Sequence, residues 1–574
     1  MTDRSVGHAD LTDPPEASPA GPAGGGPRAA RFAATFGADA DRNVERLRTA
    51  FDLPASTSDV GAVDDTAAPT TVRVAGAGTI GGRQGWAWSH SPLPGTAGDD
   101  LDHTRLAEDA ATVAVQDAGR LQVRTGISGA QGLYHWVDAD GSAAVLASLP
   151  TPIVDAGIAA PTADWDAWAQ IISTGGPLGD RTPFREVRRL GPEQALTVAA
   201  DGRVAVVPRR WEWLGEVPEG AAGLDDVATA LDDAVARQAR RNPLRILLSG
   251  GWDSRVLATL AVRHDPATSA WTTSKDAGTA WEELIARQVA LQLGLDHRLR
   301  QPDARAFEDD LHAYVGTVGY LTAYHVWLHH LARSLADQPG TVLDGLGGGV
   351  FFGGAFPPTV GVGTDQDRRF AQLVRYLRSA PGVLRPSVET QLTERSRAGF
   401  DRATRHLQGH REVDALSAYL TRTLPGIGHG PFGLVAAFSR AASPFLDHDV
   451  VTSSMAIPVA DRRDRRLYPA LLRRWARSVA DLGTAVEPAP RHRRRPQRGA
   501  CVRTATAVRT ALVGHPVGEL LHPRLRGADI ATWQQHLESK ADQHILRSLW
   551  MLALWLDHYR PGGDGPEVLA RPTG

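Results

Sequence analysis

A short polar motif between two apolar stretches carries the clearest chemical signal in the sequence. It follows the apolar run Ile246–Leu248, precedes a helical pattern of apolar residues, and reads Ser249-Gly250-Gly251-Trp252-Asp253-Ser254. Glycines let a backbone approach an anion closely, and the N–H groups and dipole of a helix N-terminus attract phosphate. Two serine hydroxyls add donors. The motif therefore predicts a phosphate-binding turn between a buried strand and a helix.

Asp253 is the unusual member of this motif. A carboxylate repels a bare phosphate, so its presence makes chemical sense when a divalent cation bridges the two groups. The motif also lacks the Gly-Lys-Ser/Thr ending of a Walker P-loop. The simpler alternative is a strand-to-helix turn with a capping serine, and the complete strand–turn–helix context favours phosphate binding over it.

The elements around the motif predict an α/β unit with a parallel sheet. A helical pattern over residues 224–239 leads into the strand at 246–248, and the glycine turn leads into another helix. The next strand is expected at Ser269–Thr273 and the next helix at Ala280–Leu293. From there to about Tyr559, helical patterns dominate.

The N-terminal part has a different pattern of residue types. Between residues 71 and 213, short runs of β-branched and aromatic residues alternate with turn signals, interrupted by one helical pattern at Asp164–Thr174. This predicts a mainly antiparallel sheet domain with few helices. The fold class expected overall is α/β plus α+β. We expect four segments: a disordered tail at 1–30, a helical extension (helix over 30–50) with a linker at 31–70, a sheet domain at 71–215 and an α/β domain at 224–560.

Composition narrows the possible functions. The 574 residues carry a formal net charge of −3, which disfavours non-specific nucleic-acid binding. The one cysteine, Cys501, excludes an intramolecular disulfide and a multi-cysteine zinc site. Neither a signal peptide nor an apolar run of about 18 residues is evident. We expect a cytoplasmic protein that binds neither nucleic acid nor membrane.

The motif at 249–254 resembles the pyrophosphate loop of the asparagine-synthetase family of ATP-dependent amide-forming enzymes. Further segments look like the family's in the same order, at Glu282–His297, Leu343–Gly354 and Ser443–His448. Upstream, Gly179–Leu190 resembles the end of the family's glutaminase-type domain. The resemblance covers about residues 71–520. It implies an N-terminal glutaminase-like (Ntn-type) sheet domain and a C-terminal Rossmann-like pyrophosphate-loop domain.

The resemblance also implies a mechanism that uses ATP and Mg²⁺. A substrate carboxylate attacks the α-phosphate of ATP, giving an acyl-adenylate and pyrophosphate, and an amine then displaces AMP. Asp253 would hold Mg²⁺, and metal and basic groups would neutralise charge on the leaving pyrophosphate. The residues implied to bind the nucleotide are Leu247, Thr272 and Thr273 at the adenosine, and Ser249, Gly250, Gly251, Asp253, Ser254, Gly345 and Gly347 at the phosphates and metal.

Several positions depart from the family pattern. In the second loop, Gly349 and Val350 stand where an acidic pair is usual, and Asp344 is the candidate to replace the missing metal ligand. Leu346 stands where β-lactam synthetases carry a tyrosine of the deprotonating dyad, which argues against that activity. A phosphate-neutralising lysine is also absent, and Arg498 could supply its charge from one position along.

The cysteine that a glutamine-hydrolysing member needs at its processed N-terminus is missing, since the chain starts Met1-Thr2. This resembles β-lactam synthetases and lasso-peptide macrolactam synthetases, in which an amine of the substrate attacks. The best single interpretation is a macrolactam synthetase acting on a precursor peptide, with a protease and a leader-binding protein as partners. The alternatives are a small-molecule ligase for an amino-acid-like substrate and a non-catalytic scaffold that lost the metal.

Two further features allow competing interpretations. The run Arg491–Arg495 is either a solvated loop or a device that steers ATP or an acidic peptide. His325 and His329 have the i, i+4 spacing of helical metal ligands, but apolar neighbours favour ordinary helix residues.

Overall fold

The structure is a computed structural model. It describes residues 31–37, 39–51, 72–76, 79–82, 85–89, 112–117, 120–199, 201–274, 281–354, 356, 364–484 and 498–571. The expected tail at 1–30, most of the expected linker and the arginine run at 491–495 lie outside these residues.

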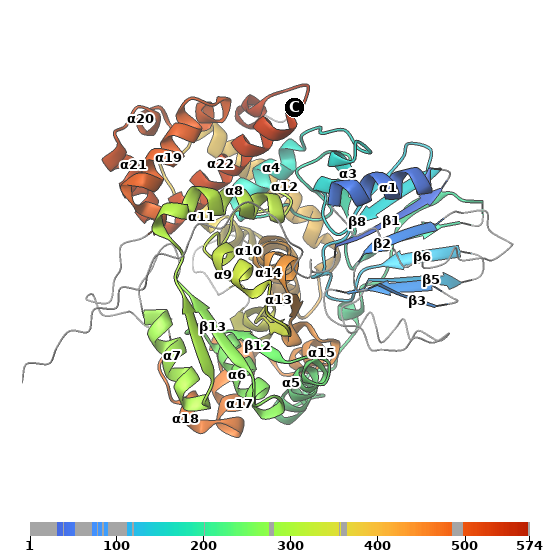
Figure 1. The fold of residues 1–574 in the computed structure, drawn as a ribbon, viewed down its shortest axis with the longest axis vertical. Helices are drawn as coiled ribbons and strands as arrows, with labels where there is room; N and C mark the ends of the chain where they lie inside the picture. The colour runs from blue at the N-terminus through green and yellow to red at the C-terminus, as the bar shows by residue number, and fades with distance from the viewer. Residues whose placement is uncertain are drawn as a thin grey trace, which may run out of the picture.

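Two antiparallel sheets build the N-terminal part, on the right of Figure 1. The first has the order β2 (Val72–Gly76), β1 (Phe32–Gly37), β8 (Ala143–Ala147), β7 (Tyr134–Val137), β9 (Arg188–Arg189). The second has the order β11 (Val204–Pro208), β10 (Gln194–Val198), β6 (Arg120–Arg124), β5 (Thr112–Asp117), β4 (Gly85–Trp88), β3 (Thr79–Gly82).

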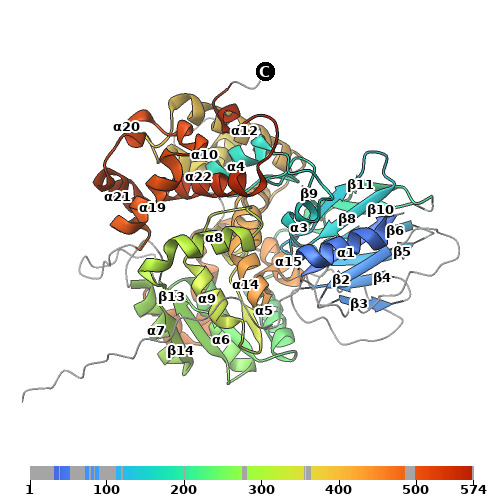
Figure 2. The ribbon, with the colours of Figure 1, turned by 45° about the horizontal axis from the view of Figure 1, so that its top comes forward.

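The two sheets enclose one apolar layer, because alternate residues of each strand point to opposite faces. Phe32, Ala34 and Phe36 of β1 pack there with Trp88 of β4 and Leu196 of β10. The other face of the first sheet is covered by α1 (Ala40–Phe51) and α3 (Thr151–Asp155), which lie above the strands in Figure 1, whereas α4 (Trp165–Thr174) packs against helices of the C-terminal part (Figure 2). The mainly antiparallel sheet and the helix at 164–174 are thus confirmed.

The helix predicted over residues 30–50 is wrong for its first third. Residues 32–37 form β1, which pairs with β8 through the register Ala34 to Leu146, and only Ala40–Phe51 is helical. Phe32 and Phe36 are four residues apart, which fits one face of a helix but also one face of a strand. Because β1 is buried on both faces, its sequence shows no alternation of apolar and polar residues that would identify it as a strand. Residues 32–51 therefore belong to the sheet unit and not to an extension.

A third, parallel sheet forms the base of the C-terminal part, with the order β14 (Asp296–Arg300), β13 (Ser269–Thr273), β12 (Leu244–Leu247), β15 (Thr341–Leu343), β16 (Arg440–Ala442). The predicted parallel sheet is confirmed. The sequence did not predict β14, β15 and β16. β14 is a polar edge strand, and β15 and β16 have only three residues each.

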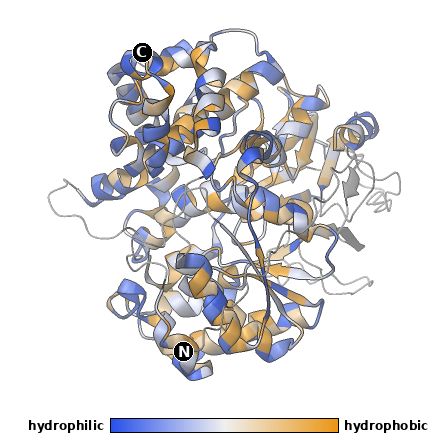
Figure 3. Ribbon diagram, turned by 60° about the vertical axis from the view of Figure 1, so that its left-hand side comes forward, coloured by the Kyte–Doolittle hydropathy of each residue, from blue (hydrophilic) through white to orange (hydrophobic). Residues whose placement is uncertain are grey.

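Helices make up most of the remaining chain, and hydrophilic and hydrophobic residues alternate along their ribbons (Figure 3). Around the parallel sheet lie α5 (Leu224–Ala239), α6 (Trp252–His264), α7 (Trp281–Leu293), α8 (Phe307–Thr317), α9 (Leu328–Leu335), α15 (His448–Ala456), α16 (Val459–Arg462), α17 (Leu467–Trp475) and α18 (Arg477–Ala480). The others are α10 (Asp365–Leu373), α11 (Arg375–Arg378), α12 (Pro386–Thr404), α13 (Val413–Ala418), the π-helix η5 (Tyr419–Phe432), α14 (Gly433–Phe438), α19 (Val502–Val513), α20 (Pro523–Arg526), α21 (Ile530–Glu538) and α22 (Lys540–Tyr559).

The N-terminal and C-terminal parts share one apolar core. Residues of α1, α4, α6, η5 and α22 all belong to the same buried cluster. From η5, the Tyr419 hydroxyl donates to the Ser128 carbonyl at 2.7 Å, and a ring nitrogen of His429 lies 3.1 Å from the Gly129 carbonyl. Within the described ranges, no helix combines the length and the apolar character needed to cross a membrane.

Candidate active site

The serine-glycine motif forms the predicted turn between β12 and α6. The Ser249 and Ser254 hydroxyl oxygens lie 3.0 Å apart, and the backbone N–H of Ser249 donates to the Ser254 hydroxyl at 3.0 Å. The backbone N–H of Gly251 donates to the Ser249 hydroxyl at 3.2 Å. The two serines therefore close the loop on itself, at the carboxyl end of the central strand, where ligands bind in open α/β sheets.

Asp253 lies in the first turn of α6 with its carboxylate buried. The hydroxyl of Tyr468, from α17, donates a hydrogen bond to Oδ1. Burial raises the pKa of Asp253 to about 6, although the Tyr468 hydrogen bond and the charge of Arg465 act in the opposite direction. Burial thus disfavours the charged form of this group.

The second loop, residues 344–349 after β15, closes over Asp253. A Cβ added to Gly345 would lie 2.6 Å from the Asp253 Cβ, and one added to Gly348 would lie 2.6 Å from Oδ1. Gly347 has φ +90° and faces Leu446, so it too requires glycine. These glycines are explained by the close approach of the two loops.

Asp344 is brought to the same place. It follows β15 directly, its backbone N–H donates to the Ala442 carbonyl at 2.9 Å, and its Oδ1 accepts the N–H of Leu346 at 2.8 Å. Burial raises the pKa of Asp344 to about 6, and the charge of Asp344 contributes to the raised pKa of Asp253. Two buried carboxylates therefore act on each other across the two loops.

This donor set fits a magnesium ion. Two neighbouring buried carboxylates repel each other, and a divalent cation removes that cost. Mg²⁺ prefers oxygen ligands and is commonly held by one or two carboxylates together with substrate phosphates. Within the described part of the chain, no group of three or more His, Cys, Asp or Glu side chains could hold a metal, so a metal here would need the two carboxylates together with substrate phosphates.

Asp344→Asn is expected to change how stability depends on pH. The folded-state pKa near 6 lies above the ordinary value of 3.8, so without metal the stabilising protonated form is lost as pH rises through 6. An asparagine lacks this loss. Relative to wild type, the variant should gain about 1 kcal/mol of unfolding free energy between pH 5 and 7.5, measured by denaturant titration in EDTA. If the difference in unfolding free energy between the variant and wild type is the same at pH 5 and pH 7.5, the pKa of Asp344 is not raised by folding.

Thr272 and Thr273 lie at the end of β13, beside the loop. The Thr272 hydroxyl donates to the Leu248 carbonyl at 2.7 Å and lies 2.8 Å from Nε2 of His297. The buried hydroxyl of Thr273 has no hydrogen-bond partner among the described residues. The predicted adenosine positions at Leu247, Thr272 and Thr273 are thus adjacent, with one polar atom left for a ligand.

Arg498 lies with α8. Its guanidinium donates to Asp310 Oδ2 at 2.6 Å and to the Asp303 carbonyl at 3.1 Å, and His329 Nδ1 lies 3.0 Å from Asp310 Oδ1. This buried ion pair accounts for the position of Arg498, and its role toward pyrophosphate stays a prediction. His325, with φ +59°, lies in the turn before α9, so the helical spacing expected for the two histidines does not hold.

Tyr468 is the main site residue that the sequence did not reveal. Its ring stacks on Trp252 with centroids 6.3 Å apart and 16° between the planes, and it packs against Phe352 and Phe445. The Arg255 guanidinium lies over the Trp252 ring, 4.8 Å from its centre. A tyrosine 215 residues from its partner gives no local signal, so only the fold could show this contact.

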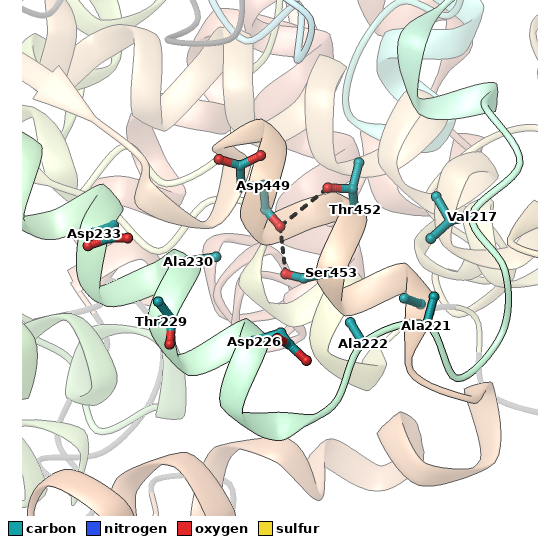
Figure 4. A pocket seen from close by; sticks show the side chains of 11 residues that line it. Val217, Ala221, Ala222, Asp226, Thr229, Ala230, Asp233, Asp449, Thr452 and Ser453 are labelled. Carbon is teal, nitrogen blue, oxygen red and sulfur yellow. Dashed lines mark hydrogen bonds between the residues drawn. The ribbon is translucent and has the colours of Figure 1, made fainter.

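A separate concavity of about 490 Å³ lies between α5 and α15 (Figure 4). Three carboxylates line it, those of Asp226, Asp233 and Asp449. The hydroxyls of Thr452 and Ser453 turn back to the backbone carbonyl of Asp449, as the dashed lines show. This acidic lining would repel a bare phosphate.

Comparison with known proteins agrees with this geometry. The family model described as asparagine synthase matches residues 226–556, which include both loops, Asp253, Asp344 and Tyr468. The chain belongs to the asparagine synthase family. Members of this family are ATP-dependent ligases that form amide bonds, typically with Mg²⁺.

Individual relatives are more distant. A protein of Mycobacterium bovis and two of Mycobacterium tuberculosis, each named "Putative asparagine synthetase (glutamine-hydrolyzing)", are 30% identical over 186 residues. The match covers 30% of this chain and 28% of each relative. The chain therefore matches about a quarter of the length of these relatives, which supports the family and not a particular substrate.

Proposed function

We propose that this protein is an ATP-dependent, AMP-forming amide ligase that acts through an acyl-adenylate. The observation that carries the proposal is the pairing of a serine-glycine loop with two buried carboxylates at the carboxyl edge of the parallel sheet. The loop supplies donors for phosphates, and the carboxylates supply ligands for the metal that accompanies them.

Each residue has a distinct task in the first step. The Ser249 and Ser254 hydroxyls and the backbone at Gly250 and Gly251 hold the leaving β- and γ-phosphates. Asp253 and Asp344 would hold Mg²⁺, which when bound neutralises charge on the pyrophosphate. An oxygen of the substrate carboxylate bonds to the α-phosphorus while the bond to the bridging oxygen of the β-phosphate breaks. Tyr468 fixes the orientation of the Asp253 carboxylate through its hydrogen bond.

In the second step an amine bonds to the acyl carbon, AMP leaves with the electron pair of the broken C–O bond, and the amine nitrogen passes one proton to solvent. Leu346 is buried and lies near Gly428. An aliphatic side chain cannot accept a proton, which argues against chemistry of the β-lactam-synthetase kind. An amine carried by the same substrate suits this step, because it replaces a bimolecular encounter.

The one cysteine of the sequence supports a proposal about the nitrogen source. Cys501 lies at the start of α19 with its sulfur 3.3 Å from the Thr504 hydroxyl, in the C-terminal part. It is not positioned on the glutaminase-like sheets. We therefore propose that the N-terminal part hydrolyses no glutamine and that the reaction closes a macrolactam in a precursor peptide of the lasso type, supplied by a protease and a leader-binding protein. A small-molecule ligase is the second candidate.

Pyrophosphate exchange tests the first step directly. Labelled pyrophosphate should enter ATP only when Mg²⁺ and a suitable acid are present, with free aspartate, free glutamate and peptides containing either residue as the acids. Full turnover should release AMP. Release of ADP would contradict adenylation. Absence of exchange with every acid, together with absence of Mg-ATP binding, would instead support a scaffold without catalysis, as Gly349 and Val350 would permit.

A further inference from the structure

A group of basic side chains surrounds two tyrosines where η5, α11 and α22 meet. We call it the cationic cluster, and it consists of Arg375, Arg422, Arg465 and Lys540 around Tyr324 and Tyr376. Arg465 and Lys540 are exposed, and the other members are partly buried. The reaction steps described above use none of them.

The tyrosines are held rigidly by aromatic packing. Their ring centroids lie 6.1 Å apart, and the His544 ring packs against both, at 4.9 Å from Tyr324 and 5.3 Å from Tyr376. Tyr324 lies directly over Gly175, which has φ +95° at the end of α4 and leaves no room for a Cβ. The two phenols therefore form a fixed platform.

The basic groups lie around this platform. The Arg375 guanidinium lies 4.5 Å from the centre of the Tyr376 ring and donates to its hydroxyl at 3.3 Å. The Lys540 ammonium lies 5.6 Å from the same ring, and the Arg422 guanidinium lies 5.4 Å from the Phe356 ring. Several positive charges thus converge on one small region.

The electrostatics of the cluster favour an anion. Burial, followed by the charges of neighbouring groups that include Arg375 and Arg465, lowers the pKa of Arg422 to about 10. Although burial raises it, Lys540 and Arg375 hold the pKa of Tyr376 below its ordinary value. Across the described ranges, no salt bridge joins Arg375, Arg465 or Lys540 to a carboxylate. An anion bound here would relieve the mutual repulsion of these cations.

The cluster adjoins the nucleotide loops. Arg465, with φ +62°, acts electrostatically on both Asp253 and Arg422, and is therefore near both groups. From the same helix as Arg422, Gly428 faces Leu346 of the second loop, with 3.6 Å from its built Cβ to Cδ2. The cluster and the second loop therefore share η5 as a neighbour.

We propose that the cationic cluster binds the carboxylate of the acid substrate before it is activated. Two anions, the carboxylate and the triphosphate, must approach each other for adenylation, and fixed cations offset their repulsion. Arg375 and Arg422 hold the carboxylate, and Arg465 bridges toward the loop. The substrate is therefore an acid recognised by its negative charge. This inference rests on the proposed ligase function and names the class of its substrate.

Binding of a small acid to the complete protein tests this assignment. The probe is N-acetyl-L-glutamate, titrated at constant ionic strength with thermal unfolding as the readout, and its uncharged counterpart is N-acetyl-L-glutamine. The acid should raise the melting temperature at millimolar concentration and the amide should not. Arg375→Gln and Arg422→Gln should each weaken the apparent affinity for the acid at least tenfold, and Arg422→Lys should restore most of it.

Two neighbouring arginines provide matched controls. Arg378→Gln changes the same helix as Arg375, and Arg466→Gln changes the residue after Arg465, and both side chains are exposed. They should bind the acid like wild type. The proposal is overturned by an equal effect of acid and amide, or by acid binding that survives in Arg375→Gln and Arg422→Gln. It is also overturned if these two variants lose Mg-ATP binding instead, since the cluster would then belong to the nucleotide.

The same measurements separate this inference from the ligase function. If the acid binds at the cluster but no acid supports pyrophosphate exchange, the site stands and the ligase function falls. If exchange occurs with some acid and is unchanged in Arg375→Gln and Arg422→Gln, the function stands and the inference falls.

Discussion

The Asp253→Asn variant is expected to lose acid-dependent pyrophosphate exchange by about a thousandfold, which corresponds to about 4 kcal/mol of transition-state stabilisation. Asparagine keeps the shape of the side chain and can still accept the Tyr468 hydrogen bond. It removes the negative charge that would hold the metal. The loss should appear in the exchange rate at saturating ATP, measured with labelled pyrophosphate.

Stability measurements exclude unfolding as the cause of that loss. Burial already disfavours the charged form of Asp253, so the neutral variant should be as stable as wild type or more stable at neutral pH. Asp449→Asn, in the acidic concavity at α15, is the matched control and should keep full exchange. Near-normal exchange in Asp253→Asn would refute the assignment of this carboxylate to the metal.

The largest effect on stability is expected at Glu412. Its Oε1 accepts from Arg462 Nη2 at 2.5 Å, and both side chains are buried. Arg462 also donates to the carbonyls of Ile457 and Phe351, at 3.0 and 3.1 Å. Glu412→Gln would leave the guanidinium charge buried without compensation, and should lower the free energy of unfolding by about 3 kcal/mol, measured by denaturant titration.

An exposed pair provides the comparison for Glu412. Glu519 lies 2.8 Å from Arg385, with more than half of its side chain exposed, and Glu519→Gln should change stability little. The double variant Glu412→Leu with Arg462→Met removes both charges and should recover much of the loss. If Glu412→Gln and Glu519→Gln lower the free energy of unfolding equally, the Glu412–Arg462 pair contributes no more than a surface contact. Arg462 donates to the carbonyl of Phe351, which lies just after the second loop. Loss of the Glu412–Arg462 ion pair should therefore also weaken nucleotide binding.

Local patterns predicted several elements of the fold, together with the first loop. The strand at 269–273, the helices α4 and α5 and the turn at 249–254 were all visible, because each has its own periodicity and capping or turn residues. β1 was not, because a strand buried on both faces has no alternation to distinguish it from a buried helix. The three short or polar strands were missed because their pairing partners, not their own residues, make them strands.

The residues of the site also differ in whether a local sequence pattern reveals them. Asp253 and the serines could be identified from one contiguous motif, and Asp344 was suggested by its position in a glycine-rich segment. Tyr468 and the cationic cluster could not, since their residues come from α17, η5, α11 and α22 and meet only after folding. Arg498 was assigned by motif position, whereas its Asp310 partner belongs to an unrelated helix.

The shared apolar core has a consequence for how this protein can change over generations. The change of texture near residues 216–223 divides the sequence, but the buried cluster continues across it from Ala33 to Leu569. A deletion of the sheets would expose Tyr419 and the rest of the η5 surface to water, and large exposed apolar patches promote aggregation. Selection for a folded C-terminal part is therefore expected to retain the N-terminal sheets as well.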